Sequence, residues 1–315
     1  MIVCCGEALI DMIPSADGEG NPVLRPVSGG AIFNTAISLG RLGVTTAMVC
    51  GLSNDLFGKQ LADDLKISGV STDFAVRSGR PTTLAFVELV DGKASYSFYD
   101  ENTAARMIQL SDIPEMPANA TTFYFGGISL CVEPACLAYA ELAERVHEDC
   151  IVMLDPNIRP SFIQDEGAYR SLLARMIGVA DIVKVSDEDL EWIAGTSADE
   201  STLVEQLKSM SMADHSPSIV IVTRGEKGAS AHLLNGEVIS VDAKRAEVVD
   251  TVGAGDTFNA GVLESLSKSD FFSKSGLQQI DNDSVQRALI RGAAVAAVTI
   301  TRAGANPPWA NELAS

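Results

Sequence analysis

The segment from Asp250 to Asp256 has the residue types and the spacing to transfer a phosphoryl group. It reads Asp-Thr-Val-Gly-Ala-Gly-Asp, follows a short apolar run and precedes a stretch of helical periodicity. If a helix begins at about Ala254, its free N–H groups and the positive end of its dipole form an anion site, which glycines let a ligand approach closely. Asp256 then lies in the first turn beside that site. An ionised carboxylate there can accept a proton from an attacking hydroxyl, while the anion site stabilises the growing phosphoryl charge.

Other kinds of glycine-rich turn fit this segment less well. Gly-x-Gly before a helix also opens dinucleotide-binding folds, usually near the first strand, but here the third glycine position is Phe258 and the segment lies late in the chain. The P-loop pattern Gly-x-x-x-x-Gly-Lys-Ser/Thr does not occur in the sequence, so a P-loop is excluded. A capped helix without a ligand remains the alternative for the segment taken alone.

A second polar segment, from Asp155 to Pro160, follows the apolar run Cys150 to Leu154. A run that is apolar throughout is typical of a strand covered on both faces. Open α/β sheets bind ligands at the carboxyl ends of their strands. Arg159 is therefore placed to neutralise phosphate charge or to hold an oxygen of the acceptor, and an ordinary surface charge is the alternative.

The elements that must position these residues alternate along the chain between apolar runs and segments of helical period. This alternation predicts a single α/β domain over 1–315, with a mostly parallel open sheet and helices on both faces. The expected strands are 1–10, 45–51, 121–130, 150–155, 181–185 and 218–223. The expected helices are 30–42, 56–69, 133–149, 166–179, 201–211, 254–268 and 283–300.

A different pattern predicts a small sheet beside this domain. The β-type runs 72–77, 82–90 and 94–101 follow one another without a helical segment, and Asp91-Gly92 is a hairpin-turn signal. Together with 11–14 and 23–27 they predict a β lid formed from about 11–27 and 72–106, able to cover a ligand. The alternative is an extra edge of the main sheet.

The composition limits partners and location. The formal charge of −19, with only 23 Lys and Arg spread along 315 residues, argues against nucleic acid and against an anionic membrane surface, because both need clustered cations. No apolar run reaches the ~18 residues of a membrane helix, and the apolar N-terminus lacks the basic region of a signal peptide. The six cysteines show no Cys-x-x-Cys pair. We therefore expect reduced core cysteines in a cytoplasmic protein.

Two signatures together resemble the ribokinase-like (PfkB) carbohydrate kinases. The segment Gly29-Gly30-Ala31-Ile32-Phe33-Asn34-Thr35-Ala36, continuing to Leu39-Gly40, is similar to the first glycine-rich signature of that family. Asp250 to Asp256 is similar to the second, D-T-x-G-A-G-D. The α/β alternation and the lid match as well, so the resemblance spans essentially the whole chain. It implies an ATP-dependent sugar kinase.

The resemblance implies which residues bind the nucleotide and perform the transfer. Asp256 is the implied catalytic base, and the implied anion hole is formed by the amides of Gly253, Ala254, Gly255 and Asp256. The segment Thr-Arg-Gly-Glu-Lys-Gly is similar to the family's T-x-G-x-x-G nucleotide loop. Its matching positions are Thr223, Gly225 and Gly228.

The resemblance also implies magnesium at the phosphates and an activating monovalent cation, expected to be potassium. Asp250 and the carbonyls of Val252, Thr299, Arg302 and Gly304 fall where relatives bind the monovalent cation.

One segment departs from the family pattern. Where many relatives carry N-x-x-E, this chain has Ser186-Asp187-Glu188-Asp189 shortly after Lys184. Asp189 is one methylene shorter than Glu, so we expect Ser186 and Asp189 to contact magnesium through water.

For the sugar, the resemblance implies a site formed by Asp11, Gly29, Gly30 and Asn34. Carboxylates and amides suit this task, because each unpaired buried polar group costs about 1–3 kcal/mol. The alternatives are that Asp11 only ends a strand and that Asn34 caps its helix.

The lid sequence indicates which sugar is the substrate. Residues 96–106 are similar to the flap of the fructokinase branch of the family, in which Phe98 would pack on the sugar. We therefore expect fructose as the acceptor and fructose 6-phosphate as the product. The resemblance also implies a homodimer contact through the lid, because the exposed flap face is often a dimer contact in this family. The nearest alternative is a 2-keto-3-deoxygluconate kinase, which shares the Asp-x-Asn-x-Arg element. Ribokinases, nucleoside kinases and a non-catalytic sugar sensor are more distant, and the intact Asp256 argues against a sensor.

Overall fold

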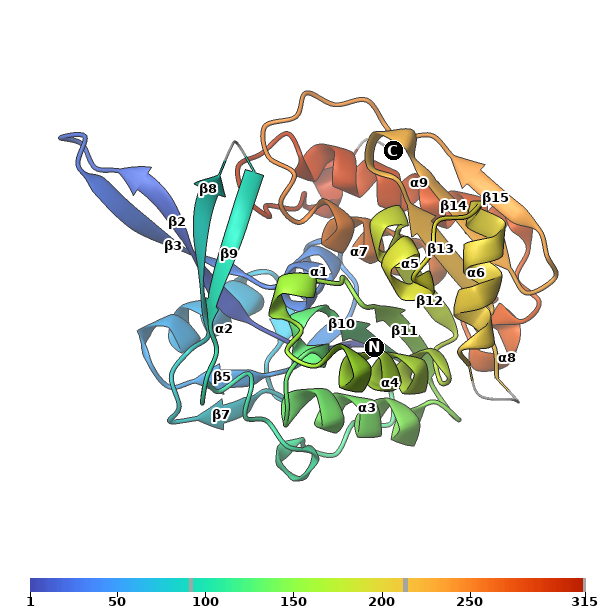
Figure 1. Cartoon of the computed structure of the whole chain (residues 1–315), viewed down its shortest axis with the longest axis horizontal. Helices are drawn as coiled ribbons and strands as arrows, with labels where there is room; N and C mark the ends of the chain where they lie inside the picture. Colours follow the sequence, from blue (N-terminus) through green and yellow to red (C-terminus); the bar gives the residue numbers. More distant parts are fainter. Residues whose placement is uncertain (91–92, 212–214, 314–315) are drawn as a thin grey trace.

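The structure, a computed structural model, describes residues 1–90, 93–211 and 215–313. Its main feature is a nine-stranded sheet in the order β15-β14-β13-β12-β11-β10-β1-β4-β6 (Figure 1). Neighbouring strands are parallel except for β14 and β15, which continue the sheet antiparallel. The strands are β1 Ile2–Cys5, β4 Thr46–Val49, β6 Val70–Ser71, β10 Thr122–Gly126, β11 Ile151–Asp155, β12 Ile182–Ser186, β13 Ile219–Thr223, β14 Ala229–Leu233 and β15 Val238–Val241.

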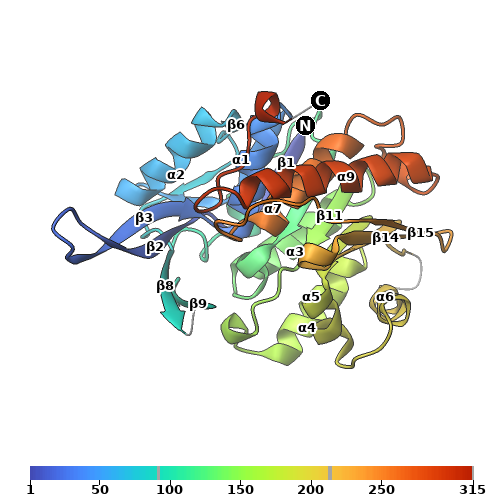
Figure 2. The ribbon, with the colours of Figure 1, turned by 90° about the horizontal axis from the view of Figure 1, so that it is seen from above.

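Helices cover both faces of this sheet (Figure 2). One face carries α1 Ala31–Arg41, α2 Leu56–Ile67, α7 Ala254–Leu266, α8 Lys274–Leu277 and α9 Asn282–Thr299. The other carries α3 Ala135–Val146, α4 Glu166–Ile177, α5 Asp187–Ala194 and α6 Glu200–Ser209. Successive residues of β1 enter opposite cores, with Ile2 and Cys4 in one and Val3 and Cys5 in the other. This explains why the central strands are apolar throughout.

The predicted fold class is confirmed, and each expected strand and helix is present. The expected strand 1–10 is divided at Gly6–Ala8 into β1 and β2 (Leu9–Ala16). The short helix α5 and the antiparallel strands β14 and β15 were not predicted. No helix in the described ranges is long and apolar enough to cross a lipid bilayer. All six cysteines are free thiols, and four of them are buried as expected.

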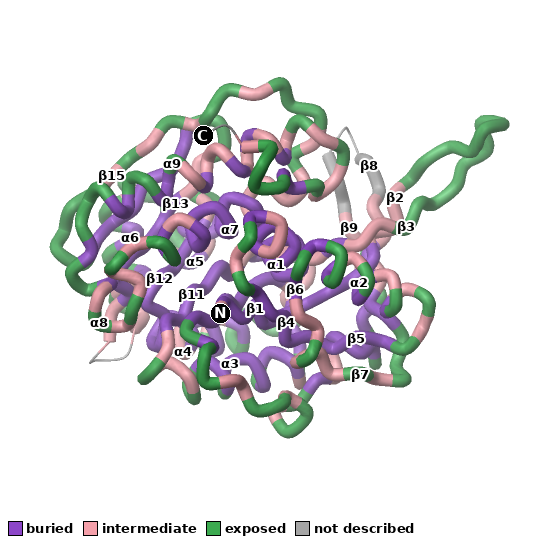
Figure 3. The backbone as a smooth tube through the Cα atoms, turned by 180° about the vertical axis from the view of Figure 1, so that it is seen from behind, coloured by how far each residue is buried: buried purple, intermediate pink, exposed green. Residues whose placement is uncertain are grey.

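A separate four-stranded sheet stands beside the main domain (Figure 1). Its order is β3-β2-β8-β9, with β3 at Pro22–Gly29, β8 at Leu84–Val90 and β9 at Lys93–Tyr99. The inner ends of β2 and β3 are buried or half-buried, while their connected outer ends are exposed (Figure 3). The predicted hairpin turn at Asp91-Gly92 lies outside the described residues.

The assignment of 72–77 to this small sheet is wrong. β6, just before this segment, pairs with β4 in the main sheet. β7 (Val76–Ser78) pairs in parallel with β5 (Gly51–Ser53) in a sheet of its own. The helix α2 between β5 and β7 allows this parallel crossover. A run of β-forming residues predicts a strand, whereas its partner depends on the tertiary path of the chain.

Helices α7 and α9 cross at very close range. A β-carbon on Gly261 would lie 2.8 Å from the carbonyl oxygen of Arg291, and one on Gly292 would lie 2.9 Å from the ring of Phe258. The crossing is also held by an ion pair, with Arg291 Nε 3.0 Å from Glu264 Oε2. The position of α7, the helix that begins with the Gly-Ala-Gly-Asp segment, therefore depends on small residues at this contact.

We expect Gly261→Ala to lower the free energy of unfolding by about 1–3 kcal/mol, because the added methyl group meets backbone atoms that cannot move aside. Gly167→Ala is the matched control, since a β-carbon there meets only the Asp165 carboxylate at 3.4 Å. Alanine favours the helix at both positions, so only packing distinguishes them. Urea unfolding gives the free energy of unfolding of both variants. An equal change from the wild type in the two variants would contradict the close-contact argument.

Candidate active site

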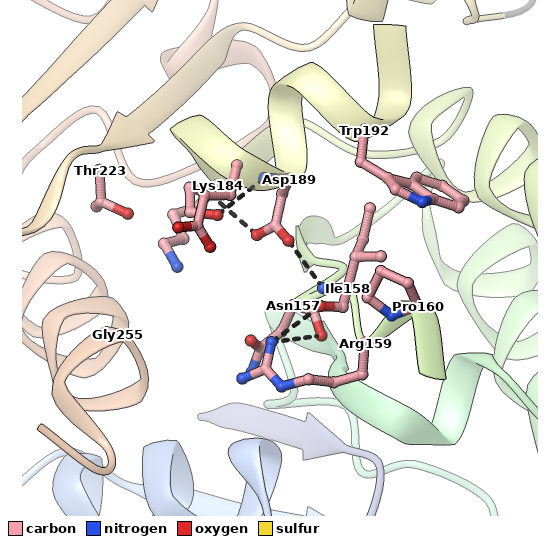
Figure 4. Close-up of a pocket in the computed structure, with 11 residues that line it drawn as sticks. Asn157, Ile158, Arg159, Pro160, Lys184, Asp189, Trp192, Thr223 and Gly255 are labelled. Atoms are coloured by element: carbon pink, nitrogen blue, oxygen red, sulfur yellow. Dashed lines mark hydrogen bonds between the residues drawn. The ribbon is translucent and has the colours of Figure 1, made fainter. Parts of the chain in front are cut away.

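The candidate site lies where the carboxyl ends of the central parallel strands meet the starts of α1 and α7. Two cavities open there, of about 370 Å³ and about 960 Å³. Thr223 and Gly255 line both of them. The smaller cavity receives side chains from the loop after β11, from β12 and from α5 (Figure 4). The cavities therefore meet at the first turn of α7.

The turn before α7 has the geometry expected of an anion site. Gly253 has a φ of 77°, in the left-handed region, and a β-carbon there would lie 2.6 Å from the β-carbon of Ala305. Only glycine suits both conditions. The amide of Ala254 donates to the carbonyl of Thr251 at 3.2 Å. No side chain in the described ranges caps α7, so the amides of Gly255 and Asp256 are the first-turn donors that a ligand can use.

Asp256 is buried at this turn, with an exposed fraction of 8%. Asn34 on α1 donates from Nδ2 to Asp256 Oδ2 at 2.8 Å, although the two residues are 222 positions apart. Burial raises the pKa of Asp256 to about 7, and the hydrogen bond from Asn34 acts in the opposite direction. A carboxyl group with this pKa is matched to proton transfer near neutral pH.

Asp11, Gly29 and Gly30 lie together at the base of the small sheet. A β-carbon on Gly29 would lie 2.2 Å from Asp11 Oδ2, so the missing side chain leaves room for this carboxylate. Burial raises the pKa of Asp11 to about 6. Gly30 precedes α1, whose first amide, that of Ala31, donates to Glu7 Oε1 at 2.9 Å. Glu7 thus fixes the loop that carries the predicted sugar ligands.

Aromatic side chains bring the small sheet into contact with the main domain. The Phe98 ring lies 4.7 Å from the Phe162 ring, between ring centroids, and stacks on Tyr96 at 6.0 Å. Burial raises the pKa of Tyr96, as does the charge of Asp11, while Arg159 opposes the shift. The Tyr96 phenol therefore lies near predicted sugar-site charges.

Arg159 is exposed and lines the smaller cavity (Figure 4). Its guanidinium donates to the carbonyl oxygens of Asn157, at 3.3 Å, and Ile158, at 3.0 Å. These bonds fold the side chain over its own loop, beside the cavity.

Lys184, Ser186 and Asp189 line the same cavity. Lys184 Nζ lies 3.0 Å from Asp155 Oδ2. Ser186 and Asp189 form a capping box at the start of α5, in which Ser186 Oγ accepts from the Asp189 amide at 3.0 Å and Asp189 Oδ2 accepts from the Ser186 amide at 3.1 Å. Asp189 Oδ1 also accepts from the Ile158 amide at 3.0 Å. These side-chain oxygens already accept hydrogen bonds from backbone amides. A water molecule bound to a metal ion would therefore share the same oxygens with the amides.

The larger cavity has a glycine-rich edge and an apolar wall. Thr223, Gly225 and Gly228 line its edge, as the nucleotide-loop match predicts. Its apolar wall suits a flat, weakly polar ring. The wall is formed by Val248, Phe258, Ala293, Ala296, Ala297 and Ile300.

The two loops of the predicted cation site lie side by side. Asp250 Oδ1 accepts from the Val252 amide at 3.0 Å, and Oδ2 accepts from the Gly304 amide at 2.8 Å. The Thr299 carbonyl accepts from the Arg302 amide at 3.0 Å. Each carbonyl oxygen has a second lone pair, so these loops fit a cation held mainly by backbone oxygens. No cluster of three His, Cys, Asp or Glu able to hold a metal occurs in the described ranges.

Several residues of the site were not predicted. Glu7 and Tyr96 lie inside segments that the sequence already indicated, and Asp155 opens the Asp-x-Asn-x-Arg element. Asn259 lies one helical turn after Asp256 and donates from Nδ2 to Asp155 Oδ2 at 2.6 Å. Its helical spacing from Asp256 was the available signal, because residues three apart share a helix face.

The chain is similar to known carbohydrate kinases over nearly its whole length. The family model described as pfkB family carbohydrate kinase matches residues 1–312. A fructokinase from Rhizobium leguminosarum bv. trifolii is 43% identical over 286 residues, which cover 91% of this chain and 86% of that protein. A solved fructokinase from Xylella fastidiosa with bound ATP gives a TM-score of 0.86 at 30% identity, covering 96% of this chain and 93% of that one. A double-mutant fructokinase from Vibrio cholerae O395, in a form with fructose, ADP and potassium ion bound, gives a TM-score of 0.82 at 25% identity, covering 96% and 93%.

The buried Asp256 makes stability depend on pH in a direction that can be tested. Its folded pKa of about 7 exceeds the usual value of about 3.9, so ionisation opposes folding. This penalty is absent at pH values below the usual pKa, grows as the pH rises between the two values and is complete above the folded pKa. We expect Asp256→Asn to be more stable than the wild type by about 1–3 kcal/mol at pH 8. Urea unfolding at pH 5 and pH 8 should show the larger difference at pH 8, and an equal difference would contradict the argument.

Proposed function

Because the chain belongs to the pfkB family of carbohydrate kinases, we propose that it transfers the γ-phosphoryl group of ATP to the terminal primary hydroxyl of fructose, yielding fructose 6-phosphate. One observation carries the proposal. The Asp256 carboxylate is buried, bonded to Asn34 and placed at the first turn of α7, where the two cavities meet.

The larger cavity is the proposed ATP site. Its apolar wall, formed on α7, α9 and the segment before α7, would hold the adenine ring. The edge formed by Thr223, Gly225 and Gly228 would lie along the ribose and phosphates. Bound ATP is part of the Xylella fastidiosa fructokinase structure.

The transferring phosphoryl group would lie at the first turn of α7. The amides of Gly255 and Asp256 would donate to its oxygens, within the anion hole expected of Gly253 to Asp256. Lys184 lies close to Gly255 in the same cavity, where it would pair with the phosphates. Magnesium bound to the phosphates would neutralise part of their charge. Ser186 and Asp189 would contact the magnesium ion through its bound water, because their side-chain oxygens already accept hydrogen bonds from backbone amides.

The sugar would lie between the small sheet and the start of α1. Asp11, Asn34 and the Gly29-Gly30 backbone would pair with its hydroxyls, and Phe98 would cover its apolar face. Arg159 would lie at the phosphate side. Asp256 would accept the hydroxyl proton as the new oxygen–phosphorus bond forms and the bond to the ADP oxygen breaks.

The loops at Asp250 and Gly304 are the proposed site of a potassium ion. They lie side by side next to the turn that opens α7, with Gly304 bonded to Asp250 and Ala305 close to Gly253, so a cation between them would hold the anion hole in place. A Vibrio cholerae fructokinase was solved with a potassium ion bound. Rates measured in potassium and in tetramethylammonium buffer test this role, and equal rates would remove it.

Two wider properties belong to the same proposal. The lid exposes Val23, Leu24 and Tyr99. We infer that this face forms a homodimer contact, which light scattering of the purified protein tests.

We also infer a cytoplasmic location, because ATP is abundant there and all six cysteines are free thiols. Recovery of the protein outside the cytoplasmic fraction would contradict that location.

The choice of sugar is tested by a substrate panel assayed with ATP and magnesium. We expect fructose to have the highest kcat/KM among fructose, 2-keto-3-deoxygluconate, ribose and nucleosides, with phosphate attached at O6. A tenfold preference for 2-keto-3-deoxygluconate, which corresponds to about 1.4 kcal/mol of transition-state stabilisation, would replace fructose in the proposal. The absence of phosphoryl transfer to all of them would favour a sugar sensor.

The role of Asp256 is tested by Asp256→Asn, which keeps the size of the side chain and removes the proton acceptor. We expect kcat to fall by roughly 10²–10⁴, while affinity for ATP changes little because the backbone amides remain. Asp250→Asn is a useful comparison, since it should disturb the cation loops and weaken ATP binding as well. A folded Asp256→Asn protein with more than a tenth of the wild-type kcat would exclude Asp256 as the base.

A further inference from the structure

Lys184 has two buried neighbours that have no role in the reaction described so far. Asp155, Lys184 and Asn259 have exposed fractions of 1%, 5% and 0%. A single oxygen of Asp155, Oδ2, accepts from Lys184 Nζ at 3.0 Å and from Asn259 Nδ2 at 2.6 Å. The three side chains come from β11, β12 and α7. They therefore join the sheet to the helix that begins at the anion site.

The Lys184 ammonium is directed at the first turn of α7. A β-carbon built on Gly255 would lie 3.4 Å from Lys184 Nζ, which is van der Waals range. Within the described ranges, Asp155 is the residue that accepts a hydrogen bond from Lys184. An ammonium group has three N–H donors. The remaining two are available to oxygens of a group bound beside Gly255.

Asp155 keeps this buried cation charged and oriented. Burial alone would lower the pKa of Lys184, but the carboxylates of Asp155 and Asp189 outweigh burial and raise it. The positive end of the ion pair lies toward the first turn of α7, at Gly255. Fixed charge aimed at the place where negative charge develops is effective because it needs no reorganisation during the reaction.

Asn259 fixes the carboxylate in turn. Its Nδ2 also donates to the hydroxyl of Tyr124 at 2.9 Å, and Tyr124 is fully buried. An amide N–H must face the carboxylate, since two oxygens would repel each other. With Nδ2 held between Tyr124 and Asp155, the Asp155 side chain has one favoured orientation.

We propose that Asp155 and Asn259 are positioning residues for phosphoryl transfer, which hold the Lys184 ammonium against the first turn of α7 so that it neutralises the transferring group. The inference rests on the proposed kinase function and deepens it. Asp155 and Asn259 contact neither ATP nor sugar in this scheme. Both act through Lys184.

A double-mutant cycle between Asp155→Asn and Lys184→Met tests this, with kcat and KM for ATP as readouts. Lys184→Met should lower kcat by about 10²–10³. Asp155→Asn should lower kcat by about 10–100-fold, with KM for ATP changed less than about threefold. The double variant should be no slower than Lys184→Met, because Asp155 then has nothing left to position. Losses that multiply in the double variant would overturn the proposal, and so would an Asp155→Asn enzyme that keeps more than half of the wild-type kcat.

A second substitution keeps the test decisive if Asp155→Asn does not fold. Asn259→Ala leaves both charges in place, and it should lower kcat about 3–10-fold in the wild type and not at all in the Lys184→Met background. Equal losses in both backgrounds would again overturn the proposal. Asp181→Asn is the matched control, because Asp181 is a buried carboxylate paired with Lys274 and precedes β12 at the end of the strand away from the site. It should lower stability and leave kcat within about twofold of the wild type.

The cycle also separates this inference from the proposed function. A wild-type protein that phosphorylates none of the sugars disproves the proposed function. The same cycle is then measured on the affinity for ADP with aluminium fluoride and magnesium, which imitates the transferring group without a sugar. Non-additive losses of that affinity are expected, and additive losses would overturn the role of Asp155.

Discussion

The proposed site depends on an electrostatic constraint at the start of α7, where a buried carboxylate must stay beside amides that would receive an anion. Asp256 and an incoming phosphoryl group are both negative, so the same turn has to reduce the repulsion between them. The Asn34 amide bonds to the carboxylate, and the Lys184 ammonium lies against Gly255. Burial still raises the pKa of Asp256 to about 7, although Asn34 and Lys184 both act to lower it. Because Asn34 lies on α1, Asp256 on α7 and Lys184 on β12, these three elements must stay in contact for the arrangement to exist.

The fold holds that turn from two directions. Gly261 and Gly292 let α7 lie almost in backbone contact with α9. At the other end of α9, the chain returns to the turn itself, where Asp250 accepts from the Gly304 amide and the Val249 amide donates to the Ile300 carbonyl at 2.8 Å. The helix pair and its two loops thus hold the turn in place. Local flexibility in the Gly-rich segment is limited by packing farther along the helices.

Sequence patterns predicted where strands and helices lie better than they predicted which strands pair with each other. The apolar run from Cys150 to Leu154 is uninterrupted, so its strand character and its burial on both faces were predictable. The partner of Val76–Ser78 was not, because pairing depends on the path through α2. The capping box of Ser186 and Asp189 is visible in the sequence and predicts a helix start, but a phosphate motif was inferred there and α5 was missed. Asp155 and Asn259 are 104 positions apart, and their contact exists only in the folded chain.

The loop after β11 relates the lid to the phosphate side of the site. At its start, Asp155 binds Lys184. In the middle, the Ile158 amide donates to Asp189, which also caps α5. At its end, Phe162 contacts Phe98 of the lid. Because these attachments follow one another in a short segment, the same backbone would set both the proposed position of the lid over the sugar and the proposed position of Lys184 at the phosphate.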